Sequence, residues 1–144
     1  MNTPPWVTLA EKELDTKEIP GSVHNSRIVE YHACTTLKAT DDETPWCSSF
    51  VNWCMYHAGF MPTRSAAARS WLDWGLRLPE PINGCIVVFR RGSSPTAGHV
   101  GFFHSVGRHG LIRVLGGNQS NKVCYANYRQ SDVLGYIWPK GYQG

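Results

Sequence analysis

The pattern of apolar residues changes near Pro79, and this change constrains the fold more than any other feature of the chain. Before Pro79, apolar side chains recur at the three- and four-residue spacing of amphipathic helices. After it come short runs rich in β-branched and aromatic residues, separated by Gly, Ser, Asn and Pro. These runs cover residues 86–89, 100–103, 111–115, 122–125 and 133–138. The sequence therefore predicts an α+β fold, with N-terminal helices packed on an antiparallel β-sheet.

The helical spacing predicts four helices in the front half. One face of the first helix would carry Trp6, Leu9, Ala10 and Leu14. This helix would end at the helix breaker Ile19-Pro20-Gly21. The other helices are expected over residues 26–37, 45–58 and 65–74. The third of the four would end before Gly59 and would bury Trp46, Phe50, Trp53 and Cys54.

The length and charge of the chain limit its domain count and its partners. The 144 residues are expected to form a single domain, residues 1–144. A net charge of +3, without a run of lysines and arginines, indicates neither nucleic acid nor a membrane surface as a partner. The chain lacks an apolar stretch of about 18 residues and the basic and apolar regions of a signal peptide. We therefore expect synthesis in the cytoplasm and no membrane insertion.

A cysteine lies in the predicted first turn of the third helix. Threonine is a favoured N-cap and proline a favoured first helical residue, so Thr44 and Pro45 would place Cys47 at the third helical position. Free backbone N–H groups and the positive end of the helix dipole favour a thiolate there. Cys54, two turns further along the helix, is expected to point into the core. Cys47 is therefore the candidate nucleophile.

Two later motifs supply candidate partners for this thiol. His99, in a strand that begins near Gly98, is the candidate base that would form an ion pair with Cys47 near neutral pH. Asn118, on the turn after the next strand, would bond to the other ring nitrogen of His99 and fix its tautomer. His104 follows His99 by five residues and would face the other side of the sheet. The remaining histidines in loop or surface contexts are His24, His32 and His109, which we expect to be solvated.

Together these segments resemble the CHAP and NlpC/P60 group of cysteine peptidoglycan hydrolases, and are most similar to its small phage- and secretion-associated branch. The resemblance rests on residues 45–53, 98–102 and 115–120, and it extends over residues 4–139. It implies a papain-like α+β fold in which Cys47 is the nucleophile, His99 the base and Asn118 the third polar residue. Many relatives carry glutamate before the asparagine, where this chain has glycine, so Gln119 is a competing partner for His99.

Relatives also suggest what else the site would bind. Some bind calcium through acidic residues just before the cysteine, but the adjacent carboxylates of Asp41, Asp42 and Glu43 do not reproduce the spacing of a calcium loop. Five cysteines without a CxxC pair predict neither a zinc site nor a disulfide framework. We therefore expect no metal and no cofactor. The residues expected to contact substrate are Trp46, Gly98 and Gln119, and Trp71 and Trp74 would line either the groove or the core.

The resemblance implies an amide hydrolase that acts on the peptide stem of peptidoglycan. Cleavage between D-glutamate and the diamino acid is favoured over the N-acetylmuramoyl-L-alanine amidase reaction. The enzyme would act in the periplasm or cell wall, as an antibacterial effector with an immunity protein or as a phage endolysin, after delivery by a secretion machine or a holin. The alternatives are a cysteine peptidase or amidase with a non-wall substrate, and a catalytically silent wall-binding module.

Overall fold

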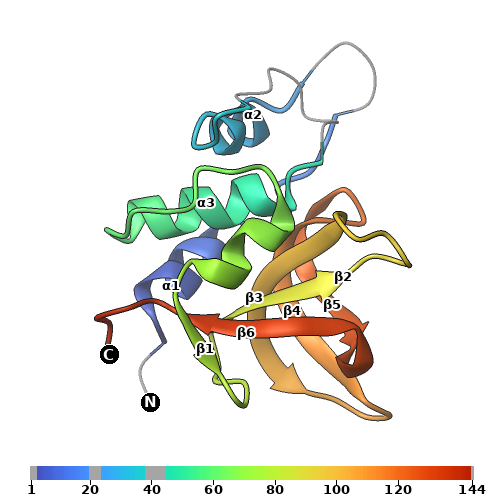
Figure 1. The fold of residues 1–144 in the computed structure, drawn as a ribbon. Helices are drawn as coiled ribbons and strands as arrows, with labels where there is room; N and C mark the ends of the chain where they lie inside the picture. The colour runs from blue at the N-terminus through green and yellow to red at the C-terminus, as the bar shows by residue number, and fades with distance from the viewer. Residues whose placement is uncertain (1–2, 20–23, 38–44, 144) are drawn as a thin grey trace.

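The computed structural model describes residues 3–19, 24–37 and 45–143 (Figure 1). Apart from one short 3-10 helix, the helices lie in the N-terminal half of the sequence and the strands follow them. The helices are α1 (Pro5–Lys12), α2 (Ser26–His32), α3 (Cys47–His57) and the 3-10 helices η1 (Ala68–Asp73) and η2 (Gln130–Asp132). The strands are β1 (Leu76–Leu78), β2 (Ile86–Arg90), β3 (Gly98–Val106), β4 (Leu111–Gln119), β5 (Lys122–Arg129) and β6 (Val133–Trp138). The predicted papain-like α+β architecture is confirmed.

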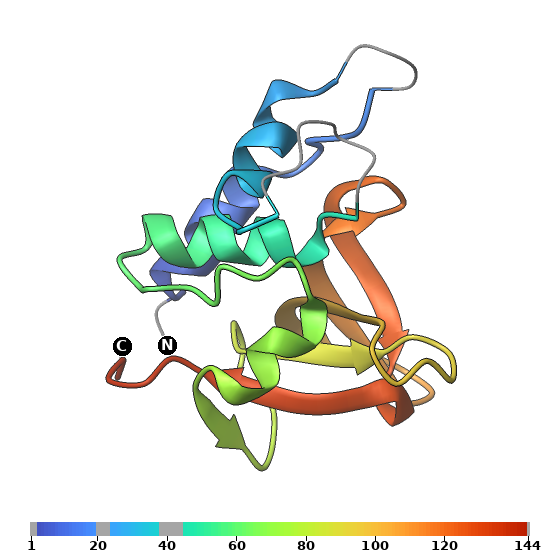
Figure 2. The ribbon, with the colours of Figure 1, turned by 45° about the horizontal axis from the view of Figure 1, so that its top comes forward.

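The six strands form one antiparallel sheet in the order β1-β6-β2-β3-β4-β5. The sheet curls strongly, with the helices gathered on one side of it (Figure 2). Because of this curl, Phe89 of β2 and Tyr128 of β5 stack with ring centroids 4.8 Å apart, although two strands separate β2 from β5. The sheet therefore has a core between itself and the helices and a second one on its concave side.

Helix α3 lies between the sheet and α2 and also contacts α1 (Figure 1). Every residue from Cys47 to Met55 is buried, so the predicted apolar stripe is too narrow. A helix with neighbours on several sides buries its whole circumference, including polar residues that find hydrogen-bond partners. Ser48 and Asn52 both bond to the carbonyl of Ser65, and Asn52 also accepts from the backbone N–H of Arg64.

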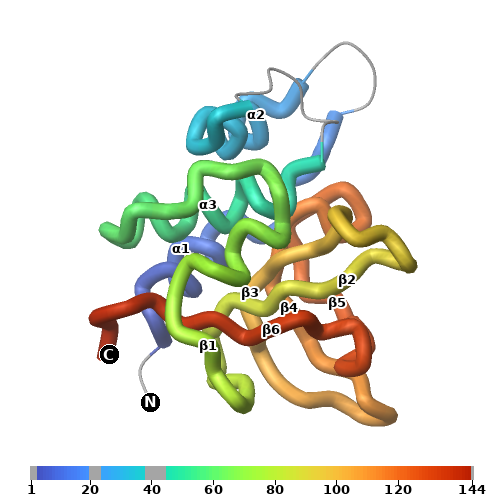
Figure 3. Tube along the Cα trace, in the orientation of Figure 1, coloured from blue at the N-terminus to red at the C-terminus, as the bar shows by residue number. Residues whose placement is uncertain are grey.

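The segment after β6 packs against the first helix, which joins the two ends of the described chain (Figure 3). The Trp6 ring contacts the rings of Trp138 at 5.3 Å and Tyr142 at 4.8 Å in edge-to-face geometry. Its indole N–H donates to the carbonyl of Gly84 at 2.7 Å. Trp6 is therefore a fully buried anchor for the C-terminal segment.

Several boundaries differ from the sequence prediction. Helix α2 ends at His32, well before residue 37, because the backbone N–H of Thr36 bonds to the carbonyl of Arg64 in a distant loop. The helix expected over residues 65–74 is the shorter 3-10 helix η1, and strand β1 was not predicted. No helix in the described ranges is both long and apolar enough to cross a bilayer.

Candidate active site

Cys47 is the first residue of α3, and not the third helical residue as predicted. The N-cap is Trp46, whose φ of −128° and ψ of 17° are not helical, while Thr44 lies outside the described residues. Burial of the Trp46 side chain explains the later start, because its indole N–H donates to Glu18 at 2.9 Å and its ring stacks on Tyr31. Tertiary packing here overrides the local start signal.

Backbone N–H groups surround the Cys47 sulfur. Trp46 provides no side-chain cap for α3, so the first N–H groups of the helix are not used by it. Cys47 is only 7% exposed, and this burial raises the pKa of its thiol. Hydrogen bonds from the N–H groups of Val100, Ser48 and Cys47 itself act in the opposite direction. The contact with Val100 places the sulfur beside the residue that follows His99.

His99 lies in β3 and is 3% exposed. Its Nε2 lies 2.8 Å from Oε1 of Gln119, and the amide nitrogen of Gln119 donates to the carbonyls of Val114 and Cys124. These two bonds fix which end of the amide faces the ring, so Oε1 must accept and His99 Nε2 must donate. The proton is thereby assigned to Nε2, which leaves the lone pair on Nδ1.

The hydrogen bond that the sequence analysis assigned to Asn118 is made by Gln119. Asn118 has a left-handed backbone conformation, with φ of 56°, inside a register shift of β4 that lies between Gly116 and Gln119. Such a bulge reverses the alternation of side chains along a strand. The reversal turns Gln119 toward His99, while within the described chain the half-buried Asn118 side chain makes no bond to the ring.

The Nδ1 atom of His99 is buried and has no hydrogen-bond partner among the described residues. A buried ring nitrogen without a partner is costly unless a group outside the resting structure uses it. Cys47 accepts a backbone hydrogen bond from Val100, the next residue of β3, so the thiol lies beside the strand that carries this lone pair. The arrangement has the parts of a nucleophile and a base with an oriented tautomer.

The predicted thiolate–imidazolium pair is disfavoured in this structure. Burial lowers the pKa of His99 to about 4, and the hydrogen bond that its Nε2–H donates to Gln119 offsets this only in part. Burial also raises the pKa of Cys47, so both groups are shifted toward their neutral forms. The helix start that would favour a thiolate is outweighed by the removal of both groups from water.

Two adjacent glycines let β4 approach this site. A Cβ on Gly117 would lie 2.7 Å from the Trp46 ring and 2.8 Å from the Cβ of Phe50, which shows how closely β4 packs on α3. A Cβ on Gly116 would lie 2.5 Å from Oε1 of Gln119. Gly116 therefore leaves room for the amide that holds His99, and Gly117 leaves room for the start of α3.

The structure gives other roles to several predicted residues. Trp46 is fully buried and cannot touch a substrate in this conformation, and Trp71 is a core residue that donates to Ser48. A Cβ on Gly98 would meet the carbonyl of Phe89 at 2.7 Å, so that glycine serves the contact between β2 and β3. The prediction that His32 is solvated is wrong, because His32 is buried and its Nδ1 lies 2.9 Å from Ser49 Oγ.

Cys54 and His104 lie away from the site as expected, whereas the thiol of Cys124 in β5 donates to the carbonyl of Gln119 at 3.2 Å. Cys54 is fully buried in the core between the helices and the sheet. All five cysteines are free. His104 is exposed, and its ring contacts Ser105 Oγ and the edge of Tyr125.

Sequence reasoning missed two residues near the site. Tyr128 of β5 stacks on His99 with ring centroids 4.9 Å apart. Arg91, exposed after β2, lowers the pKa of both Cys47 and His99 through its positive charge. Arg91 directly follows β2, which pairs with the strand that carries His99. Its position next to that strand was the signal that could have predicted a cation near the site. Tyr128 carried none, since it reaches His99 only through the curl of the sheet.

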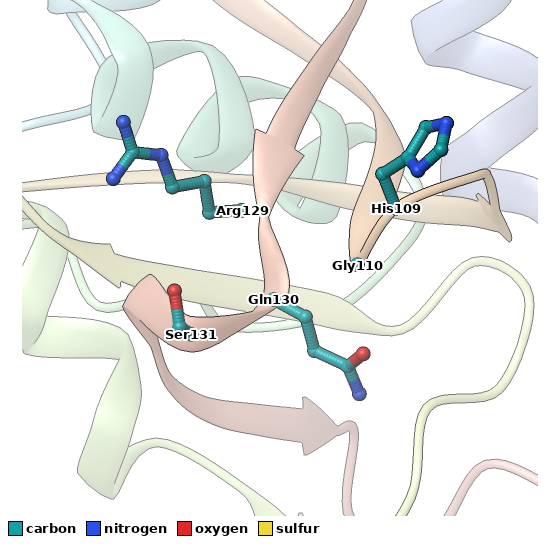
Figure 4. A pocket seen from close by; sticks show the side chains of 5 residues that line it. All are labelled: His109, Gly110, Arg129, Gln130 and Ser131. Carbon is teal, nitrogen blue, oxygen red and sulfur yellow. The ribbon is translucent and has the colours of Figure 1, made fainter.

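A surface hollow of about 440 Å³ lies elsewhere, where β5 ends. Its lining residues are His109, Gly110, Arg129, Gln130 and Ser131 (Figure 4). The Arg129 and His109 side chains point to opposite sides of the strand, and they do not converge on a common point. None of Cys47, His99 and Asn118 lines this hollow.

No group of three or more His, Cys, Asp or Glu side chains in residues 3–19, 24–37 and 45–143 could hold a metal ion. The acidic segment Asp41-Asp42-Glu43 lies outside these ranges. The hydrogen-bonding groups around Cys47 and His99 are backbone N–H groups and the Gln119 amide, which suit a sulfur and an imidazole.

Comparison with known proteins identifies the family and the fold of the chain. The profile of the CHAP domain family matches residues 39–118, which is more than half of the chain and ends one residue before Gln119. Among solved structures, the wild-type endolysin LysIME-EF1 is similar with a TM-score of 0.53 and 19% sequence identity. The match covers 81% of this chain and 64% of that endolysin chain, and it shows a shared fold. No curated protein matches the sequence.

Proposed function

Because the chain belongs to the CHAP domain family, we propose that it is a peptidoglycan hydrolase that cleaves an amide bond with Cys47 as nucleophile and His99 as base. One observation carries this proposal: His99 donates from Nε2 to Gln119, while its buried Nδ1 has no partner in the described chain and lies in the strand whose Val100 bonds to Cys47. The fold that the chain shares with an endolysin supports a wall substrate.

The reaction begins with a neutral pair. As Sγ of Cys47 attacks the carbonyl carbon, the thiol proton moves to Nδ1 of His99, whose Nε2–H remains hydrogen-bonded to Oε1 of Gln119. The two pKa shifts favour proton transfer in step with attack over a stored thiolate. Backbone N–H groups at the start of α3 are placed to stabilise the oxyanion.

The tetrahedral intermediate then collapses. The C–N bond breaks, and His99 passes its Nδ1 proton to the leaving amine, which gives an acyl-enzyme on Cys47. Water, deprotonated by the same nitrogen, attacks the thioester. The C–S bond breaks, Cys47 leaves and takes its proton back from Nδ1 of His99, and the product is released as a carboxylic acid that ionises in water. Gln119 keeps the ring in one tautomer through both halves of the cycle.

We propose cleavage between D-glutamate and the diamino acid of the peptide stem. Digestion of purified sacculi followed by mass spectrometry of the released muropeptides tests both bond and substrate. We expect a new amine on the diamino acid and a disaccharide that retains a dipeptide. Glycan chains without any peptide would establish the N-acetylmuramoyl-L-alanine amidase reaction instead, and intact stems on broken glycan would contradict amide hydrolysis.

Cys47→Ala removes the proposed nucleophile, and Cys54→Ala is the matched control because it removes a buried thiol from the core. We expect no products with folded Cys47→Ala, and products with Cys54→Ala after correction for lost stability. A wild-type protein that binds sacculi without releasing peptides would indicate a silent wall-binding module. Cleavage of other peptides with no action on sacculi would indicate a non-wall peptidase.

We place the site of action in the cell wall. A contact-dependent secretion machine would deliver an effector, and a holin would release an endolysin. The neighbouring genes separate these routes, because a cognate immunity gene accompanies an effector and a holin gene accompanies an endolysin.

A further inference from the structure

We propose that Tyr128 is a positioning residue of this active site, and that its ring, stacked on the His99 imidazole, holds the plane of the imidazole and with it the direction of the Nδ1 lone pair. The assignment rests on the proposed function, because it presumes that His99 acts on Cys47. It adds a fourth side chain to the site, from a strand that the family profile does not reach.

The rings form a compact cluster from three strands. Tyr128 stacks on His99 at 4.9 Å with an interplanar angle of 22°, and on Phe89 at 4.8 Å with an angle of 28°. Phe89 and His99 lie 6.2 Å apart. Phe89 is buried and Tyr128 is half-buried, so Phe89 supports Tyr128 from the inside of the curled sheet.

The hydrogen bond to Gln119 does not fix the ring plane by itself. In histidine, Nε2 lies nearer than Nδ1 to the extended Cβ–Cγ bond, so rotation about that bond displaces Nε2 less than it displaces Nδ1. This terminal rotation also has a broad intrinsic energy profile. Contact with a ring face opposes such rotation directly. The Tyr128 stack therefore controls the direction of the Nδ1 lone pair, while Gln119 controls the tautomer.

The stack also keeps water from the imidazole. Within residues 3–19, 24–37 and 45–143, the charged or titratable groups that we find beside His99 are Arg91 after β2 and Tyr128 of β5. Cys47 of α3 lies near Tyr128, and Gln119 of β4 is neutral. None of these is a carboxylate that would hold a proton on the ring. Burial is the main cause of the low pKa of His99, about 4, and the Tyr128 ring covers one face.

Substitution of Tyr128 separates positioning from general stability. We expect Tyr128→Phe to keep kcat within about threefold of wild type, because the ring remains, and Tyr128→Leu to lower kcat by about 10–100-fold with little change in KM. The acid limb of kcat/KM should also move up by at least about one pH unit in Tyr128→Leu, since a hydrated imidazole titrates nearer its usual pKa of about 6.5. The control is Phe103→Leu, which removes an aromatic ring from the core on the concave side of the sheet. The Phe103 ring contacts Tyr136 and does not stack on His99.

Proton and nitrogen NMR of His99 provides a readout that needs no turnover. In wild type we expect the ring protons of His99 to be shifted upfield by the stacked Tyr128, and the pKa of His99 to be near 4. Tyr128→Leu should abolish the upfield shift and raise the pKa of His99. Phe103→Leu should change neither the shift nor the pKa. Unshifted His99 signals in wild type would overturn the proposal even if the leucine variant failed to fold. An equal effect of Tyr128→Leu and Phe103→Leu would overturn it too. Intact NMR signatures in a protein that hydrolyses nothing would instead reject the proposed function alone.

Discussion

Gly116 and Gly117 are neighbours in β4, but an added methyl group would meet different partners at each. At Gly116 the close atom is Oε1 at the far end of the Gln119 side chain, so an added methyl group would displace the buried amide from its hydrogen-bond partners. That movement would break its bond to His99. At Gly117 the close atoms belong to Trp46 and Phe50 in the core, which cannot move freely.

Gly116→Ala and Gly117→Ala should therefore separate activity from stability. We expect Gly116→Ala to lower kcat by about tenfold or more, and to lower the free energy of unfolding by less than Gly117→Ala does. Gly117→Ala should cost about 1–3 kcal/mol, because overpacking forces the start of α3 away from β4. Urea unfolding and sacculus digestion measure the two effects. Equal stability losses in both variants would contradict the assigned roles.

The orientation of His99 can be tested at Gln119 and Asn118. Gln119→Ala should lower kcat by about 10–1000-fold, because the ring loses its acceptor and its preferred tautomer. Asn118→Ala should have a smaller effect on kcat and cost about 1 kcal/mol in stability, since alanine tolerates the left-handed conformation less well. The reverse order of effects on kcat would return the role to Asn118.

Burial of His99 should make the fold sensitive to acid. Its pKa is about 4 in the folded protein and about 6.5 when unfolded, so the unfolded state binds the proton first. Stability is therefore full above pH 6.5 and falls as the pH drops from about 6.5 to about 4, by up to ~3 kcal/mol. We expect His99→Gln to lose much of this dependence in urea titrations over this range, whereas the exposed His104→Gln should keep it.

At the scale of elements, the sequence predicted what local signals encode. The helix that carries Cys47, the strand that carries His99 and the helical front half all follow from apolar spacing and turn residues. The start of α3 did not, because burial of Trp46 decides it. The choice between Asn118 and Gln119 depends on a single backbone angle inside β4, which no periodicity reveals.

The loop between β2 and β3 supplies a charge that the mechanism does not use. Arg69 of η1 donates to the carbonyls of Ala97 and Ser94, which ties this loop to the helix layer. Arg90 pairs with Asp132, whereas Arg91 has no ion pair or hydrogen bond within the described chain. Peptide stems carry carboxylates, and an exposed unpaired cation beside the nucleophile would attract them.

Arg91→Ala should therefore raise KM for peptide stems by about 3–30-fold with little change in kcat. The increase of KM should be smaller at high salt, because salt screens the charge of Arg91. Arg90→Ala is the matched control, because its exposed ion pair contributes only about 0–1 kcal/mol to stability and its charge is already paired. Kinetics on a soluble stem peptide measure both variants. Equal increases of KM in both would mean that net charge, and not the position of Arg91, governs binding.

On the scale of the whole molecule, the curl of the sheet is what completes the site. It brings β5 against β2 and so sets Tyr128 on His99, while α3 crosses the other face with Cys47 at its start. A strand pattern read from sequence predicts pairing and alternation but not the accumulated twist of six strands. The aromatic contact across the sheet therefore lay beyond sequence reasoning.

The packing of Tyr142 on Trp6 stabilises the molecule at a place distinct from the site. Tyr142→Ala removes an edge-to-face contact with Trp6 and a partner of Trp138, and we expect it to lower the free energy of unfolding by about 1–3 kcal/mol. Because Trp6 bonds to Gly84 and none of these rings contacts Cys47 or His99, kcat of the folded variant should stay at the wild-type value. Urea unfolding and kinetics well below the melting temperature measure the two quantities. A fall in kcat without a fall in stability would show that the C-terminal segment is coupled to α3 through α1, within the core that they share.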